Sequence, residues 1–211
     1  MPDATNTFAE RAARAEAIVR PLPQSKASFD IDLKHLGGWI EKFGNDWGGF
    51  VREPDYQRGR VWTEGQQVAF VEGMLRGTVT RDLQRLQINI PHWEVDEPGG
   101  DLPRRIELVD GLQRLTAIER ALAGELQLFG QPPEVFAGTR YDLRRVNTWM
   151  IKIQVHTFAW REDLLGYYLA INAGGTPHSA SELDRVRELL DESRHTENAS
   201  TLFRPSWVAS P

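Results

Sequence analysis

Cysteine is absent from the 211 residues of this chain, and no apolar stretch is long enough to cross a bilayer. Without cysteine, the chain cannot form disulfide bonds, thiolate metal sites or a cysteine nucleophile. A membrane-spanning helix needs roughly 20 apolar residues, and a secretory signal needs an apolar core that the N-terminus lacks. We therefore expect a cytoplasmic protein with no membrane partner.

Several catalytic and cofactor motifs are missing as well. The sequence contains no HExxH, no P-loop, no GxGxxG and no GxSxG motif. Its histidines, at positions 35, 92, 156, 178 and 195, do not have the spacing of metal ligands. We therefore expect no zinc site, and we expect His156, which falls on a strand, to be a half-exposed structural residue.

The chain also lacks an excess of basic charge. It has 30 Asp and Glu residues against 25 Lys and Arg residues, which gives a formal net charge of −5. Coating DNA requires a concentrated basic surface, so any contact with nucleic acid must be local. Five arginines either supply such a contact or are simply solvated: Arg76, Arg81, Arg85, Arg104 and Arg105.

The composition is that of a folded globular protein. Hydrophobic residues make up 40% of the chain and charged residues 26%, far from the signature of disorder. One main domain with extensions is expected at this length. We place an N-terminal amphipathic helix and linker at 1–28, the domain at 29–192 and a flexible tail at 193–211.

Apolar periodicity predicts short strands separated by helices. Alternation predicts strands at 85–90, 105–109 and 150–158, the first with one face in water. Helical stripes and caps, including Thr63 with Gln66 and Ser179 with Glu182, predict helices at 8–20, 64–76, 112–123 and beyond 179. The predicted fold class is α/β, of the α+β kind, with a small mixed sheet and surrounding helices.

The strand at 105–109 leads directly into a helix through the sequence DGLQR, residues 110–114. A helix start offers free backbone N–H groups and the positive end of the helix dipole, which suit a phosphate. Gly111 lets the backbone approach closely, and Arg114 can add a bidentate contact. Asp110 either caps the helix reciprocally with Gln113 or points outward to a Mg²⁺ ion that bridges to the phosphate.

Two further segments contain candidate ligand contacts. In the loop PDYQRGRVW, Tyr56 and Arg58 suit stacking on a base and contacting phosphate, or Tyr56 and Trp62 anchor the loop in the core. In NAGGTP, Asn172 could donate to an oxygen in a shared pocket, or the segment is a plain connection between helices.

Taken together, PDYQRGRVW at 54–62, ELVDGLQRLTAI at 107–118 and INAGGTPHSASEL at 171–183 resemble the N-terminal domain family of GmrSD-type modification-dependent restriction enzymes. The similarity spans roughly residues 29–190, and that family belongs to the ParB/sulfiredoxin-like superfamily. The matched positions are Gln57 and Arg58 in the first motif, Asp110, Gly111, Gln113 and Arg114 in the second, and Asn172 in the third.

The resemblance implies a single ParB-like domain that binds a nucleoside triphosphate with Mg²⁺, often hydrolyses it, and serves prokaryotic or phage DNA restriction or DNA metabolism. The sequence departs from the family pattern at Leu112, where a second glutamine is usual, and at 77–82, which lacks an expected proline. The first departure weakens the case for hydrolysis more than the case for binding. No histidine–asparagine nuclease core is found, so cleavage is expected to need a separate nuclease or effector chain, or metal-dependent activity of this domain.

Three hypotheses about function follow. The first is a nucleotide-binding domain with weak NTPase activity, in which Asp110 positions Mg²⁺, Arg114 and Arg58 hold phosphates, and Gln57 or Gln113 orients the water. The second is a metal-dependent DNA nuclease with Asp55 and Asp110 as metal ligands. The third is a non-catalytic module that binds DNA or a partner protein.

Overall fold

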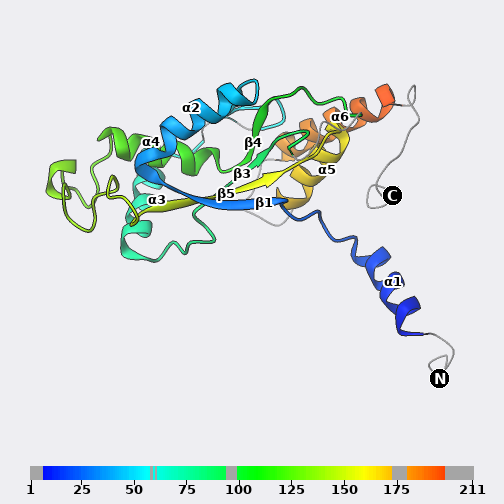
Figure 1. The fold of residues 1–211 in the computed structure, drawn as a ribbon, viewed down its shortest axis with the longest axis horizontal. Helices are drawn as coiled ribbons and strands as arrows, with labels where there is room; N and C mark the ends of the chain where they lie inside the picture. Colours follow the sequence, from blue (N-terminus) through cyan, green and yellow to red (C-terminus); the bar gives the residue numbers. More distant parts are fainter. Residues whose placement is uncertain (1–6, 58, 60, 94–98, 173–179, 198–211) are drawn as a thin grey trace. The chain divides into compact units, whose positions relative to one another are not determined.

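The computed structural model describes residues 7–57, 59, 61–93, 99–172 and 180–197 of the chain. Five strands form one mixed sheet in the order β1-β5-β3-β4-β2 (Figure 1). They are β1 (Ala27–Asp32), β2 (Phe50–Val51), β3 (Arg85–Asn89), β4 (Ile106–Asp110) and β5 (Met150–His156). β5 pairs antiparallel with β1 and parallel with β3, while β4 pairs antiparallel with β3 and parallel with β2.

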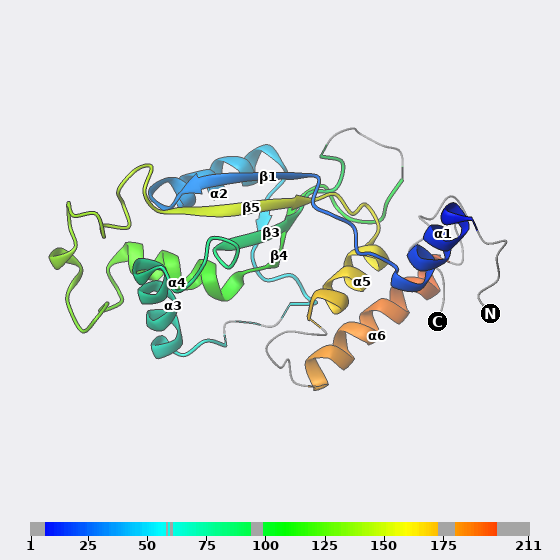
Figure 2. The same ribbon diagram turned by 90° about the horizontal axis from the view of Figure 1, so that it is seen from below.

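The α-helices in the described residues are α1 (Phe8–Val19), α2 (Leu36–Asp46), α3 (Glu64–Arg76), α4 (Leu112–Ala123), α5 (Arg161–Asn172) and α6 (Ala180–Glu197). Two 3-10 turns, η1 (Leu33–His35) and η2 (Pro133–Val135), complete the elements. α3 and α4 lie side by side in both views of the ribbon (Figures 1 and 2). A mixed sheet with helices around it confirms the α+β fold class.

Most predicted elements are found close to their expected bounds. The capping box at the start of α3 is present, with the Thr63 hydroxyl accepting from the Gln66 N–H and the Gln66 side chain accepting from the Thr63 N–H. The two-residue strand β2 was not predicted from the sequence. α6 continues to Glu197, so residues 193–197, expected in the tail, are helical. Ser179, the expected cap of this helix, lies outside the described residues.

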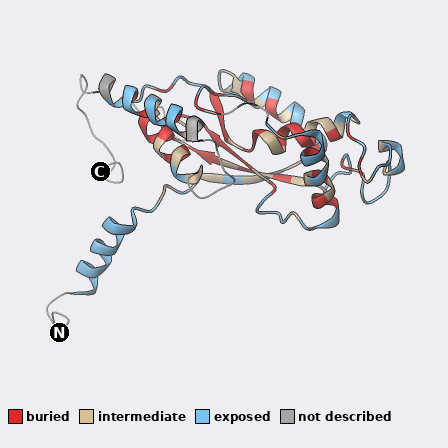
Figure 3. Ribbon diagram, turned by 180° about the vertical axis from the view of Figure 1, so that it is seen from behind, coloured by how far each residue is buried: buried red, intermediate tan, exposed pale blue. Residues whose placement is uncertain are grey.

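One face of the sheet is aliphatic and contributes to a continuous core with α2, α3 and α4. Alternate residues of β3, β4 and β5 supply this face, and all are fully buried: Leu86, Ile88, Ile106, Leu108, Ile151, Ile153 and Val155. Burial of this much apolar surface is the main source of stability. The buried residues of the sheet lie in β3, β4 and β5, whereas β1 and β2 are intermediate or exposed and the whole of α1 is exposed (Figure 3).

The opposite face of the sheet is polar along β3 and at the end of β5, and it is buried there too. Gln87 and His156 are 4% and 3% exposed, and Oε1 of Gln87 lies 3.0 Å from Nε2 of His156. Asn89 is fully buried, and its side chain donates to the backbone oxygen of Phe158 and accepts from its N–H. The expected wet face of β3 and the expected half-exposed His156 are therefore wrong, because hydrogen bonds let these polar groups be buried.

The chain divides into two compact units, Ser25–Arg161 and a second unit made of Met1–Gln24 with Glu162–Pro211. The sheet, α2, α3 and α4 belong to the first unit. No helix in the described ranges combines the length and the apolar character that spanning a membrane requires.

Candidate phosphate-binding site

The predicted phosphate site is the junction between β4 and α4, where a buried strand turns directly into a helix. Gly111 makes this turn in the left-handed region, with φ of 110°, and α4 begins at the next residue. A Cβ on Gly111 would lie 2.5 Å from Cδ2 of Leu86 and 3.2 Å from the carbonyl oxygen of Arg85. A larger residue would be strained and would collide with β3, so the turn requires glycine.

The N-terminus of α4 is not capped by any side chain among the residues that the structure describes. Asp110 lies outside the helix and does not accept from its N–H groups, so the expected reciprocal cap with Gln113 is wrong. The first turn of a helix has N–H groups without intrahelical partners, and the helix dipole adds partial positive charge there. An anion at this position would meet donors that no side chain occupies.

Asp110 instead forms an ion pair with Arg114, one helical turn further on. Oδ2 of Asp110 lies 2.5 Å from Nη2 of Arg114, and the arginine side chain is only 19% exposed. The guanidinium therefore stays at the junction and does not extend into solvent. Because the carboxylate engages Nη2, a phosphate would compete with Asp110 for that donor.

Two buried side-chain atoms at this junction have no hydrogen-bond partner. Nε2 of Gln57 donates to the backbone oxygens of Leu108 and Val109, at 3.1 and 3.0 Å, which brings the amide against the end of β4. Oε1 of the same amide and Nε of Arg114 are the buried polar side-chain atoms left unsatisfied in the described part of the chain. Such atoms are rare, and a bound water or ligand commonly accounts for them.

Gln113, in the first turn of α4, forms hydrogen bonds with the backbone of the loop at 54–62. Its Oε1 accepts from the backbone N–H groups of Val61 and Trp62, both at 3.1 Å, and its Nε2 donates to the oxygen of Gly59 at 2.9 Å. Both ends of the amide are therefore engaged with the backbone of the loop. Arg58, the other predicted phosphate contact in this loop, lies outside the described residues.

Tyr56 is part of a buried polar network with Glu107, which the sequence analysis did not identify. The Tyr56 hydroxyl donates to Oε2 of Glu107 at 3.2 Å, and Arg105 donates to Oε1 from Nε and Nη2, at 2.9 and 2.7 Å. With 2% exposure, the Tyr56 ring has no free face for a base, which favours its anchoring role. The signal for Glu107 was available, since a lone carboxylate in an apolar strand is costly unless it is paired.

Asp55, the other predicted metal ligand, is on the surface. Its Oδ2 lies 2.7 Å from Nη2 of Arg161, and its side chain is 54% exposed. The described residues contain no group of three or more His, Cys, Asp or Glu side chains that could hold a metal ion. Asp110, the predicted ligand at the junction, has its carboxylate paired with Arg114, so the magnesium ion stays a prediction.

Asn172, predicted to contact a ligand, is the last residue of α5 in the second unit. Its Nδ2 donates to the backbone oxygen of Tyr168 at 2.8 Å, one turn earlier in the helix. Residues 173–177, the rest of the NAGGTP segment, lie outside the described residues. The role of Asn172 therefore stays a prediction.

Leu112, where the chain departs from the expected glutamine, is 4% exposed and belongs to the hydrophobic core with Leu115 and Ile118. A side chain in this position is directed into the core, so it has no polar role at the junction. The remaining polar side chains that meet there are Gln57, Asp110, Gln113 and Arg114.

Comparison with known proteins gives one match. A search of curated proteins and a search of solved structures each find nothing similar to this chain. The model of one family, described as the N-terminal domain of the GmrSD restriction endonuclease, matches residues 40–169. That range holds β2 to β5, α3 and α4, the junction and the loop at 54–62. The chain therefore belongs to the family of the GmrSD restriction endonuclease N-terminal domain.

Proposed function

We propose that the β4–α4 junction binds the phosphate groups of a nucleoside triphosphate, in a domain that serves DNA restriction. The observation that carries this proposal is the convergence of three groups at one place. The start of α4 has no side-chain cap, and the neighbouring Gln57 and Arg114 each keep one buried polar atom without a partner. A phosphate offers acceptors for the N–H groups and for the guanidinium.

Each polar side chain at the junction has a distinct role in this proposal. Arg114 binds phosphate oxygens, and Gln113 keeps the loop at 54–62 in place over the junction. Oε1 of Gln57 is an unoccupied acceptor and can orient a water molecule, as a weak NTPase requires. Because both amide atoms of Gln113 are engaged, Gln57 is the better candidate for that step.

Magnesium enters the proposal through the nucleotide. A Mg²⁺ ion that bridges phosphate oxygens takes one or two carboxylates from the protein, and Asp110 is placed to be one of them. The ion would add positive charge beside the phosphates. In that state Asp110 would exchange its ion pair with Arg114 for the metal, which frees Nη2 for a phosphate oxygen.

Isothermal titration of the purified chain with ATP, GTP, CTP and UTP, each with Mg²⁺, tests the proposal. We expect binding of at least one triphosphate and release of phosphate at a low rate. Arg114→Ala should weaken that binding by roughly ten- to a hundredfold, the scale of a lost charged hydrogen bond.

A matched control is Arg145→Ala, which removes an exposed arginine outside the junction. This variant should bind the nucleotide as the unchanged chain does. Absence of binding by all four triphosphates at millimolar concentration would remove the proposal. Equal affinity in the Arg114→Ala variant would show that the phosphates bind elsewhere.

A further inference from the structure

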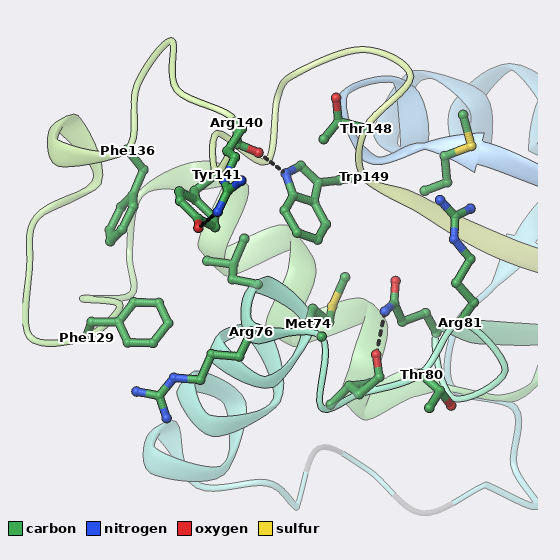
Figure 4. Close-up of a pocket in the computed structure, with 15 residues that line it drawn as sticks. Met74, Arg76, Thr80, Arg81, Phe129, Phe136, Arg140, Tyr141, Thr148 and Trp149 are labelled. Atoms are coloured by element: carbon green, nitrogen blue, oxygen red, sulfur yellow. Dashed lines mark hydrogen bonds between the residues drawn. The ribbon is translucent and has the colours of Figure 1, made fainter.

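A second candidate binding region lies in the first unit, in a pocket that no part of the proposed function uses. The pocket has a volume of about 720 Å³, within the range of small-molecule sites. Its walls come from the end of α3, the loop before β3, and the long segment between α4 and β5 (Figure 4). We call it the aromatic–arginine pocket, after Arg76, Arg81, Phe129, Phe136, Arg140, Tyr141 and Trp149 in its lining.

The charge of this lining is opposite to that of the chain. Three arginines line the pocket, and none of its lining residues is acidic, although the chain as a whole carries a formal charge of −5. Glu72, which is not part of the lining, is next to it: its Oε2 lies 4.0 Å from Nη2 of Arg76, and its Oε1 accepts from the backbone N–H of Phe129 at 2.6 Å. A concave surface with cations of one sign attracts an anion.

Two of the arginines lie over aromatic rings. The guanidinium carbon of Arg76 lies 4.7 Å from the ring centre of Phe129, and that of Arg140 lies 4.7 Å from the ring centre of Tyr141. Arg140 also donates from Nη2 to the Tyr141 hydroxyl. Such stacking orients the guanidinium plane while leaving N–H donors at its edge for an anion.

The aromatic side chains offer flat surfaces to a planar ligand. Nε1 of Trp149 donates to the backbone oxygen of Arg140 at 3.1 Å. This hydrogen bond restrains the indole ring beside the segment that precedes β5. Figure 4 shows Trp149, Tyr141, Phe136 and Phe129 around the same hollow, with Met74 beneath them. An aromatic ring bound here would stack on these side chains, and stacking on aromatic side chains does not depend on which base is bound.

Arg81 differs from the other two arginines. It is exposed on the loop before β3, and no ion pair or hydrogen bond of its side chain is found among the described residues. Its loss should therefore remove charge from the pocket without breaking a structural contact. This makes Arg81 the most direct probe of binding.

We infer that the aromatic–arginine pocket binds a nucleoside monophosphate unit, with the base against the aromatic rings and the phosphate against Arg81. Planar rings and an arginine, Arg81, that has no ion pair among the described residues together match a ligand that is both aromatic and anionic. The unit can be a free nucleotide or part of a single DNA strand, because both present the same base and phosphate. The inference does not depend on the β4–α4 junction.

Titration of the full chain with deoxyadenosine and deoxycytidine 5′-monophosphates, followed by calorimetry, tests the pocket. Deoxyadenosine, which lacks the phosphate, and deoxyribose 5-phosphate, which lacks the base, should each bind at least about tenfold more weakly than the monophosphate. A short fluorescein-labelled single strand, followed by anisotropy, identifies the source. Tighter binding of the strand assigns the pocket to DNA, and equal or weaker binding assigns it to free nucleotides.

Three variants locate the binding. Arg81→Ala and Tyr141→Ala should each weaken monophosphate binding by about tenfold, the scale of one charged hydrogen bond or one stacking contact. Arg145→Ala, an exposed arginine outside the lining, and Arg114→Ala, at the junction, should leave it unchanged. Circular dichroism confirms that each variant is folded.

The inference is overturned if no monophosphate and no strand binds saturably. It is also overturned if binding is equal in the unchanged chain and in folded Arg81→Ala and Tyr141→Ala variants. Loss of monophosphate binding in Arg114→Ala alone would place the nucleotide at the junction and leave the aromatic–arginine pocket without a ligand. Failure of triphosphate binding, by contrast, would contradict only the junction.

Discussion

The β4–α4 junction and the aromatic–arginine pocket both present arginine to an anion, but they hold it in different ways. At the junction, Arg114 is only 19% exposed and is paired with the carboxylate of Asp110 at 2.5 Å. In the pocket, Arg76 and Arg140 rest on aromatic rings at 4.7 Å, and the lining contains no carboxylate. The first arrangement fixes the cation by charge and the second by stacking.

This difference has consequences for what each region can recognise. The junction is part of a hydrogen-bond network in which Gln57 and Gln113 bind backbone atoms, so its geometry is set by the fold. A ligand there must match fixed N–H groups and displace an existing ion pair. The pocket offers flat rings and uncompensated charge, which tolerate a range of planar anions. We therefore expect the junction to be sensitive to small changes and the pocket to be tolerant.

Replacement of one glycine in each region tests this contrast most strongly. Gly111→Ala at the junction should destabilise the fold by about 2–5 kcal/mol, because strain at positive φ adds to the collision with Leu86. Gly77→Ala in the pocket lining also introduces a residue at positive φ, of 80°, but a Cβ there meets nothing within 4 Å. It should cost only about 1 kcal/mol.

Urea denaturation of the two variants and of the unchanged chain gives these free energies of unfolding. Equal destabilisation by the two replacements would mean that backbone strain alone accounts for the lost free energy of unfolding. Close packing of Gly111 against β3 would then contribute nothing. A Gly111→Ala variant of unchanged stability would contradict the tight turn at the junction.

Acid should destabilise the sheet beside the junction through His156. Burial lowers the pKa of this histidine from 6.5 to about 4, and its Nε2 lies 3.0 Å from Oε1 of Gln87. The unfolded chain binds a proton near pH 6.5 and the folded chain only near pH 4. Stability is therefore present above pH 6.5 and falls as the pH drops toward 4, by about 3 kcal/mol.

Unfolding free energies at pH 7 and pH 4.5, for the unchanged chain and for His156→Gln, measure this contribution. The glutamine keeps an amide donor toward Gln87 and does not titrate in this range. The fall in stability between the two pH values should be smaller in the variant. An identical fall would assign the acid sensitivity to other groups.

The alternation of apolar residues was sufficient to predict β3, β4 and β5, and helical stripes with their caps predicted α3 and α4. Periodicity reports which residues share a face, but it does not report whether a polar face is wet. Gln87 and Asn89 were therefore placed in water, although each finds a hydrogen-bond partner on another segment and is buried. The two-residue strand β2 is too short to produce a pattern and is defined only by its pairing with β4.

Sequence reasoning located the candidate junction but not the partners within it. β4, Gly111 and the start of α4 are local features of the sequence, so the sequence alone predicted them. The attachment of Gln113 to residues 59–62 and of Gln57 to the end of β4 joins segments about 50 residues apart, which no local pattern encodes. The Asp110–Arg114 pair was open to prediction from its i,i+4 spacing, but capping by Asp110 was considered instead.

Loss of the loop attachment should have an intermediate effect, confined to the junction. Gln113→Ala removes three hydrogen bonds to the backbone of the loop at 54–62 and should cost roughly 1–2 kcal/mol of stability. Triphosphate binding should weaken by about tenfold, because the loop is no longer held beside the phosphates. Binding in the aromatic–arginine pocket should be unaffected.

Gln131→Ala provides the control, since Gln131 is exposed and lies outside the junction. Calorimetry with the triphosphate and with the monophosphate, on both variants, separates the two regions. Weakening of both ligands by Gln113→Ala would show that the junction and the pocket are one coupled site.

The smallest effect, and the one that distinguishes the roles of the junction carboxylate, is expected from Asp110→Asn. The carboxylate competes with phosphate for Arg114, so its removal should tighten binding of a triphosphate in EDTA, by no more than about tenfold. If Asp110 also takes a magnesium ion, the same variant should bind the triphosphate more weakly than the unchanged chain when Mg²⁺ is present. The sign of the effect therefore reverses with the metal, which a purely structural ion pair would not produce. Tighter binding under both conditions would limit Asp110 to restraining Arg114, and unchanged affinity under both would remove it from the site.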